Sequence, residues 1–366
     1  IFKPDEVSTL SADANTAFLE YVVSDNKTYL FVLTGSGNAA PNVAVFTIPL
    51  KRKELSDQVG ALREKIASHN LLVREPARQA YEVLLKPAAA LLRSKTNLII
   101  VPDDVLWDLP FQALLTESNH YLIEQAAISY APSLTVLREM IGKERKGKTR
   151  ENPSLLALGN PSLGQTTMER ARSSQRDEKL DPLPEAEREV QTLGRLYGQS
   201  RSEVHVGPEA REDLAKQEAG RFRILHFATH GIINNSSPMY SHLVLSQGDS
   251  KEDGLLEAWE LLNLDLHADL VVLSACETAR GEVGAGEGVI GLSWALFVAG
   301  TPTTVVSQWK VDSAATTQLM VDFHRNHLAA TSKAQSLRKA MLRLLADKQH
   351  QHPFYWAPFV VIGDAN

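Results

Sequence analysis

Two side chains in the sequence have the chemistry of a nucleophile and its acid/base partner. Cys276, the single cysteine, directly follows the apolar segment ADLVVLSA, and His230 closes the segment RILHFATH. Both segments have the composition of buried parallel strands, whose carboxyl ends meet at the edge of an α/β sheet where ligands bind. An imidazole beside a thiol favours the thiolate and can return a proton to a leaving amine. The sequence therefore predicts a dyad of these two residues.

The order and spacing of the two residues match one class of thiol peptidase. His230 lies 46 residues before Cys276, close to the roughly 50 residues that separate the two in caspase-type sites. Gly231 follows the histidine, and without a Cβ its main-chain N–H can approach a substrate carbonyl closely. We therefore predict an oxyanion hole built from the N–H groups of Gly231 and Cys276.

Segments across nearly the whole chain resemble the CHAT family of caspase-like, separase-related cysteine peptidases, which are often fused to tetratricopeptide repeats. HFATHG and LVVLSACETARG carry the resemblance most specifically, and further segments follow in the family's order: LIIVPDDVLWDLPFQAL, LLALGNPSL, LPEAEREV, GEGVIGLSWALFVAGTPTTVVSQWKVD and FYWAPFVVIG. The resemblance implies a caspase/separase-type fold whose dyad uses the second His of HxxxH and the Cys of SACE, which are His230 and Cys276 here. The chain opens on Ile1, so we expect an upstream regulatory or repeat module outside it.

The substrate groove is assigned by position. In caspases the strand after the nucleophile lines the groove, which points to Ser307, Gln308 and Trp309, whose main-chain groups would pair with an extended peptide. Glu277 and Asp312 would place negative charge near a specificity pocket and favour a basic side chain before the scissile bond. The residues after the cysteine differ from the caspase signature, so the caspase preference for Asp is not carried over.

The resulting hypothesis is an intracellular cysteine endopeptidase that cleaves a partner protein through an acyl-enzyme intermediate, without metal or cofactor. One cysteine allows no intrachain disulfide and no thiolate cluster for zinc, which fits a reducing cytoplasm. A net charge of -6 without a basic stripe argues against direct nucleic-acid binding. The longest apolar runs, such as 98–101 and 270–273, are too short to span a membrane.

Two other functions stay open from the sequence. Gly286, Gly288 and Gly291 fit G-x-G-x-x-G at the start of a predicted helix, with Asp312 further along, as in dinucleotide-binding proteins. In that fingerprint the first glycine follows its strand at once, whereas Cys276 and the residues after it intervene here. The other alternative is a catalytically silent interaction scaffold, against which the presence of both dyad residues argues.

The elements that position these residues fall into two predicted lobes. Residues 1–150 form a smaller α/β lobe without a His–Cys pair, which we predict to be non-catalytic and pseudo-protease-like. It holds a hairpin at 17–34, a further strand at 43–48, helices between 50 and 92, and short strands in TNLIIVPDD and AAISYAPS. The charged run at 143–153, closed by Pro153, marks the boundary.

Residues 151–366 form the predicted catalytic lobe, in which apolar strands alternate with helices. This pattern predicts a mostly parallel sheet covered by helices on both faces. Strands are expected in SLLALGNP, at 223–230, 241–246, 268–275 and 301–309, and in WAPFVVIG, with helices at 183–197, 287–299, 312–328 and 333–346. A polar, irregular segment is expected at 164–181. His226 is predicted to be a satisfied strand histidine, and the remaining histidines of the lobe are placed at the surface or at helix ends: His242, His267, His324 and His327.

Overall fold

The computed structural model describes residues 10, 14–36, 39–146, 154–174, 180–234, 236–248, 252–275 and 287–366. These form two compact units. The described residues of Ile1–Gly142 and Thr331–Asn366 belong to the first unit, and those of Lys143–Gly281 and Glu287–Ala330 belong to the second. The sequence had placed the whole C-terminal part in the second lobe, whereas the segment from Thr331 onward groups with the first unit.

The first unit is built on a mixed sheet with the strand order β3-β2-β1-β4-β5-β14. β1, β2 and β3 are consecutive antiparallel strands, which confirms the predicted hairpin and third strand, while β4, β5 and β14 run parallel to one another. The strands are β1 (Thr16–Val23), β2 (Thr28–Ser36), β3 (Ala39–Ile48), β4 (Asn97–Val101), β5 (Ala127–Tyr130) and β14 (Phe359–Gly363).

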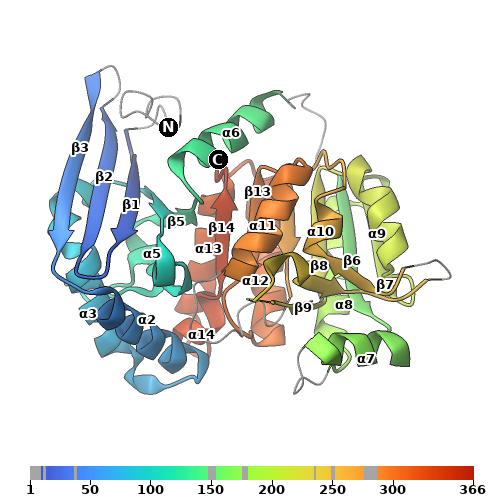
Figure 1. The fold of residues 1–366 in the computed structure, drawn as a ribbon. Coiled ribbons are helices and arrows are strands. Elements are labelled where there is room, and N and C mark those ends of the chain that lie inside the picture. The colour runs from blue at the N-terminus through green and yellow to red at the C-terminus, as the bar shows by residue number, and fades with distance from the viewer. Residues whose placement is uncertain are drawn as a thin grey trace. The chain divides into compact units, whose positions relative to one another are not determined.

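The longest helix of the first unit, α2, buries one apolar stripe. In α2 the stripe comprises Leu55, Val59, Leu62 and Ile66, which recur at the spacing of successive helical turns. The α-helices are α2 (Arg52–Ala67), α3 (Arg74–Leu84), α4 (Ala89–Leu92), α5 (Leu122–Gln125), α6 (Leu134–Lys146), α13 (Lys333–Ala346) and α14 (Pro353–Trp356). Figure 1 shows these elements in blue, teal and red. The 3-10 helices are η2 (Leu71–Val73), η3 (Lys86–Ala88), η4 (Asp104–Asp108) and η5 (Phe111–Ala113).

The second unit contains parallel strands in the order β13-β12-β8-β6-β7. β8 and β12 are buried along their whole length, which agrees with their uninterrupted apolar sequences. The strands are β6 (Leu155–Pro161), β7 (Ser202–Gly207), β8 (Ile224–Ala228), β12 (Leu270–Leu273) and β13 (Thr303–Ser307). A separate antiparallel sheet has the order β11-β10-β9 and comprises β9 (His230–Ile232), β10 (His242–Val244) and β11 (Leu255–Glu257).

Helices of the second unit connect its parallel strands, and Figure 1 shows these elements in green, yellow and orange. The α-helices are α7 (Gln165–Ser174), α8 (Pro184–Tyr197), α9 (Glu212–Glu218), α10 (Ala258–Leu261), α11 (Glu287–Ala299) and α12 (Ser313–Leu328). The 3-10 helices are η6 (Gln199–Arg201), η7 (Ala219–Arg221) and η8 (Pro238–Tyr240). The predicted class, a mostly parallel α/β fold flanked by helices, is therefore confirmed.

Several elements of the second unit differ from the sequence-based expectation: α9, α10, β9 and β11 were not predicted, and β10 lies in the antiparallel sheet. The segment 164–181 was expected to be irregular because it is polar, but it contains α7. β7 was not predicted, because its sequence SEVHVG is half polar and every residue of it is only partly buried. Within the described part of the chain, no helix combines the length and apolar character that crossing a membrane would require.

Candidate active site

The strand register of the second unit brings the ends of two central strands to one edge. β8 and β12 are parallel neighbours, with Leu273, the last residue of β12, opposite Phe227. His230 follows the end of β8 and opens β9. Residues that leave both strands therefore emerge at the same edge. Cys276 and Glu277 lie outside the described residues, and the last described position before them is Ala275.

The His230 ring is oriented by a main-chain carbonyl. Its Nε2 lies 2.8 Å from the carbonyl oxygen of Asp181, just before α8. Because a carbonyl only accepts hydrogen bonds, this contact assigns the proton to Nε2 and leaves Nδ1 as the basic nitrogen of the neutral ring. The half-buried imidazole is thus oriented by this contact, with the proton of the neutral ring on Nε2.

The segment that carries Asp181 is fixed by the end of β6. Asn160 has a positive φ of 48°, a backbone conformation that Asn tolerates better than most residues. Its Oδ1 accepts a hydrogen bond from the N–H of Leu183 at 2.7 Å, and its Nδ2 donates to Glu187 at 2.9 Å. The strand end therefore determines where α8 begins, and with it the position of the Asp181 carbonyl.

A cavity of about 330 Å³ adjoins His230. Its lining is mostly apolar and comes from the end of β6, from α7 and from the segment before α8: Asn160, Pro161, Ser162, Leu163, Met168, Leu180, Asp181, Pro182, Leu183 and His230. None of these residues except His230 was singled out from the sequence. The sequence did indicate this region, because the segment SLLALGNP was predicted to be a strand. In the structure this segment forms β6, which runs parallel to β8 and ends at the same edge of the sheet.

The predicted groove residues occupy buried positions at the end of β13. Ser307 has no exposed surface, and Gln308 and Trp309 are 5% and 3% exposed. The Ser307 hydroxyl donates a hydrogen bond of 2.8 Å to the carbonyl oxygen of Ala275. The Ser307 side chain thus holds the main chain at the position directly before Cys276, and the substrate-binding role of the three residues stays a prediction.

Asp312 and Gly291 have local structural roles. The Asp312 carboxylate caps α12 by accepting a hydrogen bond from the N–H of Ala315 at 2.9 Å. Gly291 permits a close approach of α11 to η8, because an added Cβ would lie 2.9 Å from the Cβ of Pro238. Gly286 lies outside the described residues, and α11 begins at Glu287, well beyond the end of β12 at Leu273. A dinucleotide site needs a tighter strand-to-helix turn than the connection between β12 and α11.

The burial of Gly231 and of three further histidines can be compared with the sequence-based predictions. Gly231 is buried in β9 opposite Leu243 of β10, and its N–H as an oxyanion donor stays a prediction. His267 is exposed, as expected. His242 and His324 are 1% and 0% exposed, so their predicted surface positions are wrong. His324 contacts Tyr197 and His226, which lie far from it in the sequence, so the local pattern does not reveal its burial.

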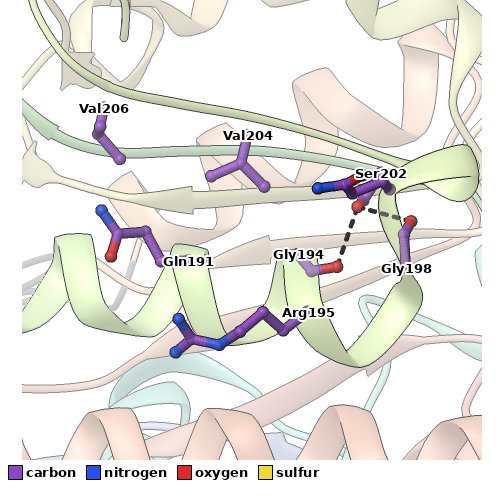
Figure 2. Close-up of a pocket in the computed structure, with 8 residues that line it drawn as sticks. Gln191, Gly194, Arg195, Gly198, Ser202, Val204 and Val206 are labelled. Carbon is purple, nitrogen blue, oxygen red and sulfur yellow. Dashed lines mark hydrogen bonds between the residues drawn. The ribbon is translucent and has the colours of Figure 1, made fainter.

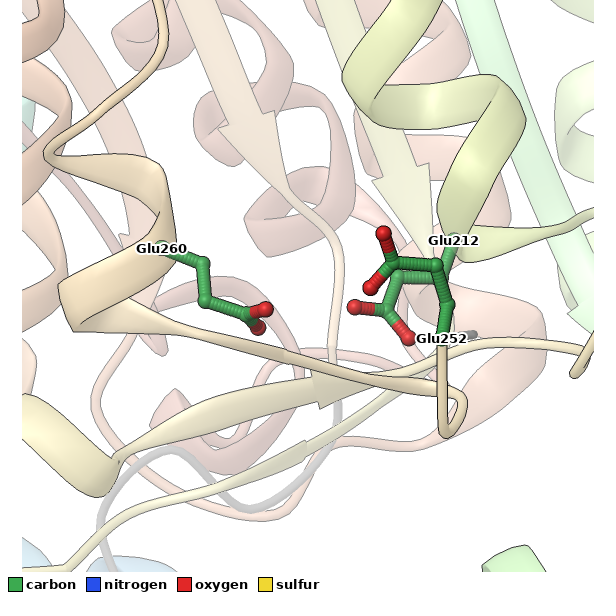
Figure 3. Close-up of side chains that lie close together, drawn as sticks. All are labelled: Glu212, Glu252 and Glu260. Atoms are coloured by element: carbon green, nitrogen blue, oxygen red, sulfur yellow. The ribbon is translucent and has the colours of Figure 1, made fainter. Parts of the chain in front are cut away.

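Three carboxylates of the second unit converge on one ammonium group. Glu212, Glu252 and Glu260 have oxygen atoms within 4.8 Å of one another, as Figure 3 shows. The Nζ of Lys216 lies 2.7, 2.6 and 2.6 Å from these three side chains. A cation is therefore already present among the carboxylates, and burial raises the pKa of Glu212 to about 6. This cluster is an internal ion network of the fold.

A larger groove of about 720 Å³ runs between α8 and β7, lined by residues that include Gln191, Gly194, Arg195, Val204 and Val206 (Figure 2). Ser202 closes one end by donating hydrogen bonds to the carbonyl oxygens of Gly194 and Gly198 at 3.1 and 3.0 Å. Its lining contains neither His230 nor another candidate nucleophile or base. The groove is therefore not the predicted reaction site.

Comparisons with known proteins agree with this fold. The sequence profile of the CHAT domain matches residues 74–364. Tetratricopeptide repeat protein 28 of Homo sapiens is 28% identical over 338 residues, which cover 79% of this chain and 13% of that protein. The Mus musculus protein of the same name is 27% identical over 342 residues, or 80% of this chain and 13% of that protein. The chain thus spans only a small part of these curated relatives.

Among solved structures, the chain is similar to separase in the separase–securin complex of Saccharomyces cerevisiae. The TM-score is 0.58 at 9% sequence identity, over 98% of this chain and 30% of that chain. At this identity the likeness concerns the fold alone. Since the CHAT profile extends over most of the sequence, from Arg74 to Asp364, the protein belongs to the CHAT domain family.

Proposed function

We propose that the protein is a cysteine endopeptidase with Cys276 as nucleophile and His230 as acid/base. The observation that carries the proposal is the hydrogen bond from His230 Nε2 to the Asp181 carbonyl oxygen at 2.8 Å. It fixes the orientation of the His230 ring at the sheet edge toward which β12 directs the chain before Cys276. Membership of the CHAT family and the separase-like fold support the same function.

In the proposed reaction the Cys276 thiolate attacks the scissile carbonyl carbon of a partner protein. The main-chain N–H groups of Gly231 and Cys276 stabilise the oxyanion. His230 then gives its proton to the leaving amine, so the C–N bond breaks and a thioester remains. In the second half His230 takes a proton from water, the hydroxide attacks the thioester, and the thiolate is released with the new carboxylate.

Substrate contacts in this proposal come from both sides of the dyad. Main-chain groups of Ser307, Gln308 and Trp309 pair with the extended peptide, and Glu277 and Asp312 favour a basic side chain before the scissile bond. The cavity next to His230 is the second candidate for a substrate side chain, because it opens on the reacting group and is largely apolar.

The proposal includes an upstream regulatory or repeat module and a location in the cytoplasm. The relatives are named for tetratricopeptide repeats, and the chain covers 13% of their length. A single cysteine fits a reducing compartment. The first unit, which has no cysteine, is then the non-catalytic lobe that supports the second.

The direct test is a set of matched variants assayed with a peptide library. We expect Cys276→Ala and His230→Ala to lower kcat/KM by about 10³-fold or more, and Cys276→Ala to abolish labelling by a peptide chloromethyl ketone. His267→Ala is the control, because His267 is an exposed histidine of the same unit. Sequencing the products gives the residue before the scissile bond. Cleavage by Cys276→Ala would show that Cys276 is not the nucleophile. If the natural sequence gave neither cleavage nor labelling, a catalytically silent scaffold would be favoured.

A further inference from the structure

Four polar side chains form a network in the interior of the second unit. Glu189 and Tyr197 belong to α8, His226 to β8 and His324 to α12. Glu189 is 2% exposed and the other three residues are fully buried. His226 Nε2 lies 2.7 Å from Glu189 Oε1, His226 Nδ1 lies 3.1 Å from His324 Nε2, and His324 Nδ1 lies 2.9 Å from the Tyr197 hydroxyl. We call these four residues the buried polar network.

One consistent set of donors and acceptors runs through this network. A carboxylate accepts hydrogen bonds, so Glu189 pairs with the Nε2–H of His226; with a neutral His226 ring, Nδ1 accepts from His324 Nε2–H, whose Nδ1 accepts from the Tyr197 hydroxyl. Burial, together with the neighbouring His226, holds the pKa of His324 well below its usual range, and burial raises the pKa of Tyr197. Both groups are therefore neutral, as the assignment requires, and every hydrogen bond has one donor and one acceptor.

A polar network at this depth is not needed for stability, because apolar residues of similar volume often replace buried polar groups without loss. The network instead selects a single arrangement of α8, β8 and α12, because hydrogen bonds are directional and unpaired buried groups are costly. Glu189 and Tyr197 are eight residues apart on α8, about 12 Å along a helix axis. The network thus holds α8 at two points and fixes both its position and its tilt.

Each element that the network joins continues into the candidate active site. α8 is preceded by the segment of Asp181, β8 is followed by His230, and α12 is preceded by the segment that begins at Ser307. A shift of α8 relative to β8 would change the distance between the Asp181 carbonyl and His230 Nε2.

We infer that the buried polar network is a positioning device that holds the Asp181 carbonyl on His230 and thereby fixes the orientation and the Nε2–H tautomer of the imidazole. Its catalytic consequence rests on the proposed function, whereas its effect on His230 does not. Glu189, Tyr197, His226 and His324 are positioning residues, because they act through α8 and β8 and do not contact the reacting atoms.

The test compares a conservative variant with an apolar one. Glu189→Gln keeps an oxygen that accepts from His226, so we expect kcat within about threefold of the natural protein. The quadruple variant E189L/Y197F/H226F/H324L removes every polar member together and leaves no orphaned partner, so it should fold. In this quadruple variant we expect kcat to fall at least tenfold, because the orientation of His230 is lost. Should it fail to fold, Tyr197→Phe, which removes one hydroxyl, is expected to give a smaller loss in the same direction.

The readout that does not depend on activity is the ¹⁵N spectrum of His230, which distinguishes the Nε2–H tautomer from a mixture of tautomers. We expect the pure Nε2–H form in the natural protein and in Glu189→Gln, and a mixture in the folded apolar variant. Thr317→Val is the matched control, because it removes another α8–α12 hydrogen bond, from Thr317 to the Glu185 carbonyl at 3.2 Å, outside the network. An unchanged His230 spectrum in the folded apolar variant would overturn the inference, whereas inactivity of the natural protein would remove only the proposed function.

Discussion

The Lys216 ammonium group balances negative charge inside the second unit. Its ammonium contacts three carboxylates, of which Glu212 is fully buried. Burial raises the folded-state pKa of Glu212 to about 6, above its ordinary value of 4.5. The folded state therefore binds more protons than the unfolded state between these two pH values, so this group lowers the free energy of unfolding as the pH rises from 4.5 to 6.

We predict that Lys216→Met strongly destabilises the protein at pH 7.5. Removing one partner of a buried ion network leaves uncompensated charge, which costs about 3 to 5 kcal/mol. The loss should shrink at pH 5, because Glu212 becomes protonated and needs no counter-charge. Denaturant unfolding at the two pH values measures this difference. Lys216→Arg keeps the cation and is the control, and an equal loss for Lys216→Met at both pH values would contradict the charge argument.

At the scale of elements, Gly300 decides how α11 passes into β13. Gly300 has a φ of 130°, and an added Cβ would lie 2.1 Å from the carbonyl oxygen of Leu266. The segment of Leu266 cannot withdraw easily, because its N–H also donates to the Ala299 carbonyl at 2.8 Å. The glycine is therefore required by both the conformation and the packing of this junction.

We predict that Gly300→Ala lowers the free energy of unfolding by about 3 kcal/mol or more, since strained backbone and a steric clash add. Gly60→Ala is the matched comparison, because Gly60 lies within α2 with nothing within 4 Å of an added Cβ. That change should stabilise the protein by about 0.5 to 1 kcal/mol through the higher helix propensity of Ala. Thermal unfolding of both variants checks the pair, and a neutral Gly300→Ala would show that the junction relaxes.

At the scale of the whole molecule, the C-terminal segment completes the first unit. Trp356, Phe359 and Val361 have no exposed surface. Gln112 donates to the Ala357 carbonyl at 2.6 Å, and Arg338 donates to the carbonyl oxygens of α5. β14 pairs with β5, so the first unit gains a sheet strand from the far end of the chain.

We predict that a chain ending at Ala330 loses the folded first unit. Limited proteolysis should then cut within residues 14–142, and circular dichroism should show no cooperative transition for this part. Gln335→Ala is the control: it removes only the side-chain hydrogen bonds to Asn97 and Thr96 and should leave the protease pattern unchanged. A lobe boundary at 150/151 predicts the opposite result, in which the shortened chain keeps a resistant first lobe.

The sequence alone determined the features that local patterns encode. Apolar runs of strand length located β6, β8, β12 and β13, and helical spacing located α8 and α11–α13, because burial of a strand or a helix face imposes a period on neighbouring residues. The positions of His230 and Cys276 after two such strands followed from the same patterns. Polar elements such as α7 and β7 were missed, because they carry too few apolar residues to mark a period.

Tertiary structure decided the contacts between residues far apart in the sequence. The Asp181 carbonyl reaches His230, and His324 reaches His226 in the interior, although nothing local marks either pair. β14 follows the same rule, since its apolar sequence identifies a strand but not the neighbour with which it pairs. The physical reason is that side-chain type and apolar period determine whether a segment forms a helix or a strand, whereas packing over the whole chain determines which other segments it contacts.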